Sequence, residues 1–112
     1  MPSTPHQMVI SQTWVKDDDH AAAYVAKATA FDDWLRARSG FVSRVLVRGV
    51  DDPCHLVHLR TFASVRDYEA LIEEPEYRRH IEDLSQHVDR ARYPTGAVTK
   101  EYGDVVWETP AS

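Results

Sequence analysis

The stretch from residue 41 to residue 62, FVSRVLVRGVDDPCHLVHLRTF, decides the fold class. Its two halves, residues 41–50 and 55–62, are rich in β-branched and aromatic side chains and predict two strands. Asp51, Asp52 and Pro53 stand between them and are typical turn residues. Because so short a turn joins neighbouring strands, the stretch predicts an antiparallel hairpin.

Segments on both sides of the hairpin predict the remaining elements. Residues 20–38 repeat apolar side chains at helical spacing after a run of acidic residues that suits a helix start, and Gly40 is well placed to end this helix. Ser64 with Asp67 resembles a capping box, and Pro75 suits the first turn of a helix. The predicted elements are a strand at 8–16, a helix at 20–38, strands at 41–50 and 55–62, a short helix at 65–73, a helix from 75 that carries its apolar stripe to 88, and a strand at 97–108.

The order β-α-β-β-α-β is that of an α+β, ferredoxin-like fold, a four-stranded antiparallel sheet with its helices on one face. The other face of the sheet carries apolar residues, and the chain has no further helix to cover it. A second copy of the same sheet is the economical cover. The sequence therefore predicts a homodimer joined through the sheets.

The composition is that of one small globular domain, expected to span residues 1–112 with an ordered core over about 8–108. Its 13 basic residues are scattered among 18 acidic ones, and this argues against nucleic acid as a partner. Cys54 is the only cysteine, so we expect no internal disulfide. No apolar run is long enough to span a bilayer and no secretory signal is visible, so we expect a cytoplasmic protein with no membrane contact.

Two segments around the hairpin resemble the antibiotic biosynthesis monooxygenase family of the dimeric α+β barrel superfamily. Residues 31–53, FDDWLRARSGFVSRVLVRGVDDP, resemble its helix end, Pro-Gly-Phe turn, second strand and hairpin, with Ser39 at the usual Pro. Residues 55–84, HLVHLRTFASVRDYEALIEEPEYRRHIEDL, resemble its third strand and the broken helix that follows. Residues 62–64, Phe-Ala-Ser, stand where the family usually has Trp-Glu-Ser. The resemblance implies a dimeric α+β barrel.

The same resemblance implies several activities on one fold: cofactor-independent oxygenation of aromatic polyketide quinols, haem degradation, polyketide cyclisation, aldehyde isomerisation or ligand binding alone. The quinol oxygenases carry an Asn and a Trp on the third strand and a Tyr on the following helix. His58, Phe62 and Tyr68 stand at these positions, so only the Tyr is kept. Leu71 and Ile81 stand at the positions of the Trp and the His of the haem-degrading relatives, so haem is not expected.

His58 and Arg60 point to one side of the strand at 55–62, because alternate residues of a strand share a face. A His that titrates near neutrality beside a fixed cation is suited to remove a proton and to stabilise the anion that results. In the alternative interpretation, both residues pair with acidic groups of a neighbouring strand or of the partner subunit. Tyr68 is expected to face the sheet, where its hydroxyl either binds a ligand oxygen or extends from the core to the surface.

The other candidates are expected to line the same pocket between sheet and helices. His80 borders the apolar stripe of the helix from residue 75 and is a second candidate for the base, whereas His87 is expected to be solvated. Trp14 and Phe62 are expected to stack on a substrate ring, although Trp14 also suits the core or the dimer interface. The predicted substrate-binding set is completed by Gln12, Leu71 and Tyr77.

No cofactor site is recognisable in the sequence. His55 and His58 lie on opposite faces of one strand, and no two histidines stand four apart on a helix, so we expect no metal site. A Gly-rich phosphate loop, a Ser-His-Asp triad and a dinucleotide fingerprint are also missing. We therefore expect no metal, haem, flavin or nucleotide.

Together these features predict a small cofactor-independent monooxygenase acting on an aromatic, polyketide-like substrate. A base, His58 or His80, forms the substrate anion, Arg60 and Tyr68 stabilise it, and the anion reacts directly with O₂. A non-redox cyclase or isomerase is the first alternative, because it would use the same base and the same anion stabiliser. A ligand-binding dimer without catalysis is the second.

Overall fold

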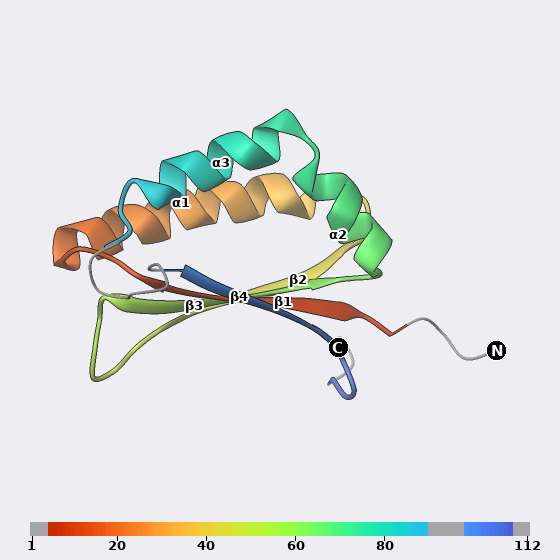
Figure 1. The fold of residues 1–112 in the computed structure, drawn as a ribbon, viewed down its shortest axis with the longest axis horizontal. Helices are drawn as coiled ribbons and strands as arrows, with labels where there is room; N and C mark the ends of the chain where they lie inside the picture. The colour runs from red at the N-terminus through yellow and green to blue at the C-terminus, as the bar shows by residue number, and fades with distance from the viewer. Residues whose placement is uncertain (1–4, 90–97, 109–112) are drawn as a thin grey trace.

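The computed structural model describes residues 5–89 and 98–108, and its elements follow the predicted order. Figure 1 shows the sheet as one layer and the helices as a second layer against it. The elements are β1 (Gln7–Trp14), α1 (Asp18–Arg36), β2 (Phe41–Arg48), β3 (His55–Phe62), α2 (Val65–Ile72), α3 (Pro75–Ser85) and β4 (Val98–Asp104). The predicted α+β, ferredoxin-like fold is confirmed.

The long helix α1 begins and ends two residues earlier than the sequence predicts. Its start is set by Asp17, whose carboxylate accepts a hydrogen bond from the backbone N–H of His20 at 2.8 Å. Its last residue is Arg36, and Gly40 lies beyond it in the left-handed conformation, at φ +83°. A side chain at Gly40 would collide with Asp67 of α2, so the turn after α1 requires glycine.

The C-terminal half departs from the predicted boundaries for a different reason. Helix α3 ends at Ser85, short of the predicted 88, because Val88 leaves the helix and pairs with Val15 in an isolated β-bridge. The last strand, predicted over 97–108, is observed as β4 over Val98–Asp104, and residue 97 lies outside the described residues.

The sheet has the order β2-β3-β1-β4, and each neighbouring pair is antiparallel. The predicted hairpin of β2 and β3 is confirmed, and β3 spans the predicted residues 55–62. Strand β3 lies between β2 and β1, so Leu59 pairs with Val45 on one side and with Ile10 on the other. This central position places one alternating set of β3 side chains, which includes Leu56, His58 and Arg60, under the helices.

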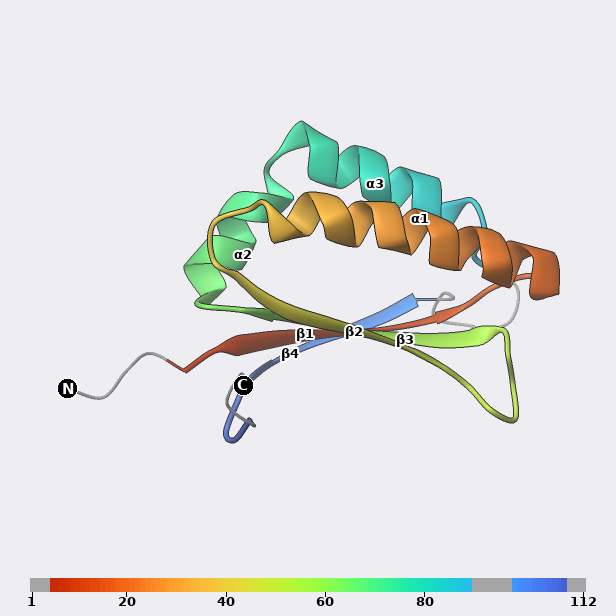
Figure 2. The same cartoon turned by 180° about the vertical axis from the view of Figure 1, so that it is seen from behind.

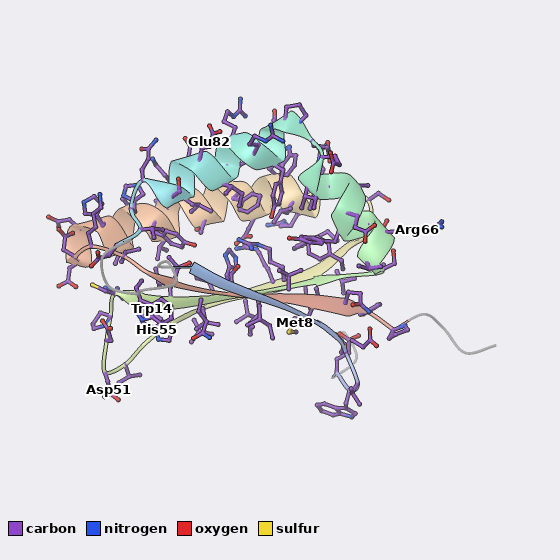
Figure 3. The ribbon with its side chains drawn as sticks, in the orientation of Figure 1. Met8, Trp14, Asp51, His55, Arg66 and Glu82 are labelled. Carbon is purple, nitrogen blue, oxygen red and sulfur yellow. The ribbon has the colours of Figure 1, made fainter. Side chains whose placement is uncertain are left out.

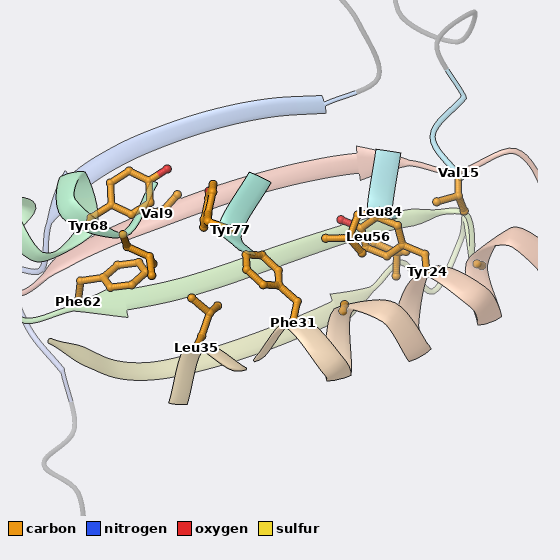
Figure 4. Close-up of a cluster of buried hydrophobic side chains, with 13 residues drawn as sticks. Val9, Val15, Tyr24, Phe31, Leu35, Leu56, Phe62, Tyr68, Tyr77 and Leu84 are labelled. Atoms are coloured by element: carbon orange, nitrogen blue, oxygen red, sulfur yellow. The ribbon is translucent and has the colours of Figure 1, made fainter. Parts of the chain in front are cut away.

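The helices cover one face of the sheet, which we call the inner face, and Figure 2 shows the same arrangement from behind. Figure 4 shows Phe31 and Leu35 of α1 on the helix side of the core, facing the β3 side chains Leu56 and Phe62. These four side chains are at most 1% exposed. Burying each one contributes roughly 1.5–3 kcal/mol, so this contact holds α1 on the sheet.

The other face of the sheet points away from the helices, and we call it the open face. Figure 3 shows Met8, Trp14 and His55 projecting from this side. The strand registers place on it Met8, Ile10, Gln12, Trp14, Val45, Val47, His55, Val57 and Leu59. Val45 is 52% exposed and Val47 is 44% exposed. Ser43 and Thr61 lie on the same face. The open face therefore carries apolar residues among polar ones, as the sequence predicts, and the dimer that would cover it stays a prediction.

None of the described helices is both long enough and apolar enough to cross a lipid bilayer.

Candidate functional site

Four polar side chains from three elements meet between α1 and the inner face, and we call them the charge cluster: Asp32 of α1, Arg44 of β2, and His58 and Arg60 of β3. Oδ2 of Asp32 accepts hydrogen bonds from Nη1 of Arg44 at 2.8 Å and from Nε2 of His58 at 3.0 Å. Nη2 of Arg60 donates a hydrogen bond to Nδ1 of His58 at 2.6 Å. The cluster thus ties the helix layer to the two strands beneath it.

The hydrogen bonds of His58 fix its protonation state. Its Nδ1 accepts from a guanidinium group and carries no proton, so the ring proton lies on Nε2 and is donated to Asp32. The side chain is 1% exposed. Burial lowers the pKa of His58, and the charge of Arg60 adds to this, while the hydrogen bond to Asp32 opposes it only in part. His58 is therefore a neutral imidazole with both nitrogens occupied.

The carboxyl group of Asp32 is ionised. Its burial alone would raise its pKa, but hydrogen bonds from His58 and Arg44 and the charge of Arg60 lower the pKa below its usual value. Burial lowers the pKa of the Arg60 guanidinium and Asp32 opposes this, and the group stays charged because arginine is not deprotonated in proteins. One carboxylate therefore faces two guanidinium groups, and the charge cluster keeps one positive charge in excess.

Of the two guanidinium groups, that of Arg60 is the more deeply buried, because the side chain of Arg60 is 6% exposed and that of Arg44 is 31% exposed. Its Nε lies 3.7 Å from Oδ1 of Asp32, an ion-pair distance, but has no hydrogen-bond partner although it is buried. The guanidinium also lies over the ring of Phe31, 4.7 Å from the ring centroid. Arg60 is thus held in place from two sides, by the carboxylate of Asp32 and by the ring of Phe31.

A cavity of about 110 Å³ lies next to Arg60. Its floor comes from β1 and β3, its side from α1, and its roof from α3 and the residues after it. The lining residues are Ser11, Thr13, Tyr24, Arg60, Ile81, Leu84, Ser85 and Val88. The hydroxyl oxygens of Thr13 and Tyr24 lie 3.4 Å apart. The cavity therefore combines one buried cation with several hydroxyl groups, and none of these eight lining residues is acidic.

The sequence predicted part of this arrangement. His58 and Arg60 lie together on the inner face, as expected, and the acid that pairs with them is Asp32 of α1 rather than a residue of a strand or a partner subunit. Arg60 lines the cavity. His58 does not, and with both ring nitrogens occupied it has none to offer a substrate, so the geometry does not support His58 as the base.

Four other predicted residues lie in the core, away from the cavity lining. Tyr68 packs against Phe62 with ring centroids 5.2 Å apart, and Leu71 is buried in the same hydrophobic cluster. Tyr77 packs edge-on against Phe31 at 5.5 Å. The core around β3 therefore holds the aromatic residues that the sequence suggested for substrate binding.

His80 is half-buried on α3. Its ring stacks on Phe31 with centroids 5.1 Å apart and lies 5.4 Å from the ring of Trp34. It borders the apolar stripe as predicted, but it is not among the residues that line the cavity.

Gln12 and Trp14 lie on the open face, across the sheet from the cavity. Trp14 stacks on His55 with ring centroids 4.6 Å apart, and Nε2 of His55 lies 3.0 Å from Oε1 of Gln12. Trp14 and Phe62 therefore point to opposite faces, and the expectation that both stack on one ring within a subunit is wrong. The residues of β1 that reach the cavity are Ser11 and Thr13.

Sequence reasoning missed Asp32, Ser11, Thr13, Tyr24 and Ser85. A signal for Asp32 was present, because it lies between Phe31 and Leu35 on the buried side of α1, where a lone acidic residue needs a cationic partner. For β1 the alternation was visible but both faces mix polar and apolar residues, so the pattern did not say which face the helices cover.

His87 was expected to be solvated, and this is wrong. It is half-buried, and its Nδ1 lies 2.8 Å from Nδ1 of His20. One of these two nitrogens donates the hydrogen bond and the other accepts it, so the pair does not present two free lone pairs to a metal ion. Within residues 5–89 and 98–108, no group of three or more His, Cys, Asp or Glu side chains is placed to hold a metal ion.

No family model matches the chain, and no curated protein matches its sequence. Solved structures do match its fold. SnoaB, a cofactor-independent oxygenase from Streptomyces nogalater solved as a mutant, matches with a TM-score of 0.80 at 12% identity, over 96% of this chain and 100% of its own. A protein of Nitrosomonas europaea, named as a proposed antibiotic biosynthesis monooxygenase, matches with a TM-score of 0.79 at 14% identity, over 98% and 99%.

Rv0793 from Mycobacterium tuberculosis matches with a TM-score of 0.76 at 19% identity, over 94% of this chain and 99% of its own. At these identities the likeness establishes the fold alone. The resemblance to antibiotic biosynthesis monooxygenases is therefore confirmed as a likeness of fold, over nearly the whole length of both chains.

Proposed function

We propose that this protein is a cofactor-independent monooxygenase that oxidises an aromatic, phenol-type substrate through its anion. One observation carries the proposal: the buried guanidinium of Arg60 lines a cavity whose other seven lining residues include no acidic side chain. A fixed cation in a site shielded from water stabilises an anion far more than it would in solution. The fold shared with a cofactor-independent oxygenase adds support.

The reaction would proceed in the following way. A phenol bound beside Arg60 loses its proton to water, because the guanidinium favours the phenolate form. The electron-rich phenolate reduces O₂ directly, a new C–O bond forms at a ring carbon, and the O–O bond breaks. One oxygen atom stays on the ring as a quinone carbonyl, and the second leaves as water with the two hydrogens lost from the substrate. The phenol gains one oxygen atom and also loses two electrons, which reduce the second oxygen atom of O₂ to water. No external reductant is therefore required.

The chain's own residues would hold and orient the anion. Arg60 is positioned by Asp32 and His58, so its guanidinium does not reorganise when charge develops on the substrate. The hydroxyl groups of Thr13 and Tyr24 supply further donors. Ile81, Leu84 and Val88 exclude water from the ring. His58 acts as a positioning residue rather than as the base.

An oxygen electrode tests the proposal. The purified protein, free of added cofactor, is given a panel of phenols and hydroquinones, and oxygen uptake is compared with the quinone formed. We expect one O₂ per quinone, and a loss of about 10²–10³ in kcat for Arg60→Gln, the usual effect of removing one anion-stabilising donor. Arg36→Gln, at an exposed position of α1, is the matched control and should keep full activity.

Conversion of a substrate without oxygen uptake would overturn the oxygenase assignment and favour a cyclase or isomerase. If Arg60→Gln does not fold, Arg60→Lys keeps the charge but loses the hydrogen bond geometry of the guanidinium. Full activity in folded Arg60→Lys would contradict the role given to the oriented guanidinium.

A further inference from the structure

The size and the charge of the cavity beside Arg60 are informative about what it accepts. A cavity of roughly 150 Å³ in a protein core accommodates one benzene molecule. Here the volume is about 110 Å³, smaller than that reference, so a fused polycycle does not fit and a single-ring ligand fits only with its substituent outside the cavity. Ile81 and Ser85 of α3 are half-buried, whereas the other six lining residues are buried. The lining is therefore most exposed at these two residues, and a ring substituent can extend to the surface there.

The walls of the cavity differ in chemistry. The sheet and α1 supply the polar groups, Arg60, Thr13 and Tyr24, whereas α3 and the residue after its end supply Leu84 and Val88. A ligand with an anionic oxygen directed to the sheet and an apolar ring under α3 would satisfy both walls. The charge cluster sets two guanidinium groups against one carboxylate, so its excess positive charge favours a ligand with one negative charge.

We propose that this cavity is a binding site for single-ring aromatic monoanions, such as a benzoate or a phenolate, with the anionic oxygen on Arg60. The site is built before the ligand arrives, because Asp32 and His58 hold Arg60 and the ring of Phe31 supports it from the opposite side. The guanidinium of Arg60, the charged group of the cavity lining, would donate to the anionic oxygen of the ligand. This inference narrows the substrate class of the proposed function. The reaction of the bound ligand rests on the proposed function, whereas its binding does not.

This class is smaller than the polyketide-like substrate that the sequence suggested. The difference follows from the volume of the cavity and from the position of Trp14. Trp14, which would have widened the aromatic surface for a polycycle, lies on the open face. The roof over the site is α3, packed on α1 through the contacts of Phe31 with Tyr77 and His80.

Binding is tested by titration calorimetry with three probes on the full chain, without oxygen turnover. Benzoate carries both the ring and the charge, benzamide has the same size without the charge, and anthracene-2-carboxylate has the same charge on three fused rings. We expect benzoate to bind at least about tenfold more tightly than either of the others, because a hydrogen bond to a charged group contributes about 1.5–3 kcal/mol. Equal binding of benzoate and benzamide, tighter binding of the anthracene acid, or no binding of benzoate at millimolar concentration would overturn the proposal.

Two variants test whether benzoate binds in the cavity beside Arg60. Arg60→Gln should abolish the preference for benzoate over benzamide, and Arg38→Gln, at a half-exposed arginine paired with Glu74, should leave it unchanged. If Arg60→Gln fails to fold, Ser85→Trp fills the mouth of the cavity without touching the charge cluster and should abolish benzoate binding. Retained binding in Ser85→Trp would place the ligand elsewhere and overturn the proposal.

The outcome is separable from that of the proposed function. Benzoate binding with no oxygen uptake from any phenol would refute the oxygenase and leave the anion site standing. Oxygen uptake that benzoate does not inhibit would refute the anion site and leave the oxygenase.

Discussion

The two faces of the sheet reverse the usual distribution of polar and apolar residues. The inner face lies under the helices, yet it buries His58 and Arg60 against Asp32. The open face points away from the helices, yet it exposes Val45 and Val47. Buried charges are unfavourable unless they are paired, and a contiguous apolar surface is unusual in a lone subunit. The inner face therefore has the character of a ligand site, and the open face has that of an interface.

The strongest test of the inner face removes the only carboxylate of the charge cluster. Asp32→Asn is expected to lower the free energy of unfolding by about 3–5 kcal/mol, because Arg44 and Arg60 would face each other and a neutral amide in a buried position. Urea unfolding measures this change. Asp33→Asn is the matched control: its carboxylate is exposed and pairs with Arg36 at 3.5 Å, so the change should be at most about 1 kcal/mol. Similar losses in the two variants would contradict the structural role of the charge cluster.

The open face is tested by introducing a charge into it. We propose that the protein forms a homodimer through this face, so Val45→Arg should weaken dimerisation by about 2 kcal/mol or more, roughly thirtyfold in Kd. Val65→Arg on α2 is the control, because Val65 is also a valine of similar exposure, 47% against 52%, and lies off the sheet. Analytical ultracentrifugation at micromolar concentration provides the measurement. A wild-type protein that is a stable monomer would refute the interface.

The pH dependence of the free energy of unfolding tests the inner face, because His58 lies there. Since the pKa of His58 is lowered in the folded state by burial, the unfolded chain binds a proton that the folded chain does not, once the pH falls below about 6.5. Stability should therefore decrease with acidification, by about 1.4 kcal/mol per pH unit for each such proton. The lowered pKa of Asp32 acts in the same direction at more acidic pH, where its protonation favours the unfolded chain.

His58→Gln isolates this contribution, because glutamine keeps hydrogen-bonding groups but does not titrate. The urea midpoint of the variant should depend less on pH between 7.5 and 5.5 than that of the wild type. His87, whose pKa is also lowered by burial and by the charges of Lys27, His20 and Lys16, is present in both proteins, so its contribution cancels in the difference. Parallel pH profiles would mean that the pKa of His58 is the same in the folded and the unfolded chain, and would contradict its lowering by burial.

The sequence predicted the features of this structure that depend on local patterns, and it missed those that depend on contacts between distant residues. The hairpin of β2 and β3 followed from alternation and turn chemistry, which are local. The pairing of His58 and Arg60 on one face followed from the same alternation. Their partner Asp32 lies 26 residues before His58 on a helix, and only the packing of α1 on the sheet brings it within 3.0 Å.

The sequence misassigned the face of β1 for a similar reason. Alternation groups Gln12 with Trp14 and groups Ser11 with Thr13, but it does not say which pair the helices cover. The sequence predicts the large aromatic residue and the amide, Trp14 and Gln12, as the ligand-binding pair. The structure instead gives the cavity the small hydroxyl residues, which leave space, and gives the open face the large ones.

The smallest expected effect tests whether the ligand binds on the face of β1 that carries Ser11 and Thr13 or on the face that carries Gln12 and Trp14. Gln12→Ala removes the contact with His55 at 3.0 Å, and because the pair is half-buried the variant should lose about 0.5–1.5 kcal/mol of stability. Its benzoate affinity and its oxygen uptake should stay unchanged, since Gln12 lies across the sheet from the cavity. Thr13→Val, the neighbouring substitution on the inner face, removes a hydroxyl from the cavity lining and should weaken benzoate binding several-fold. If Gln12→Ala lowered the affinity more than Thr13→Val, the ligand would bind on the open face, and the division between the two faces would fail.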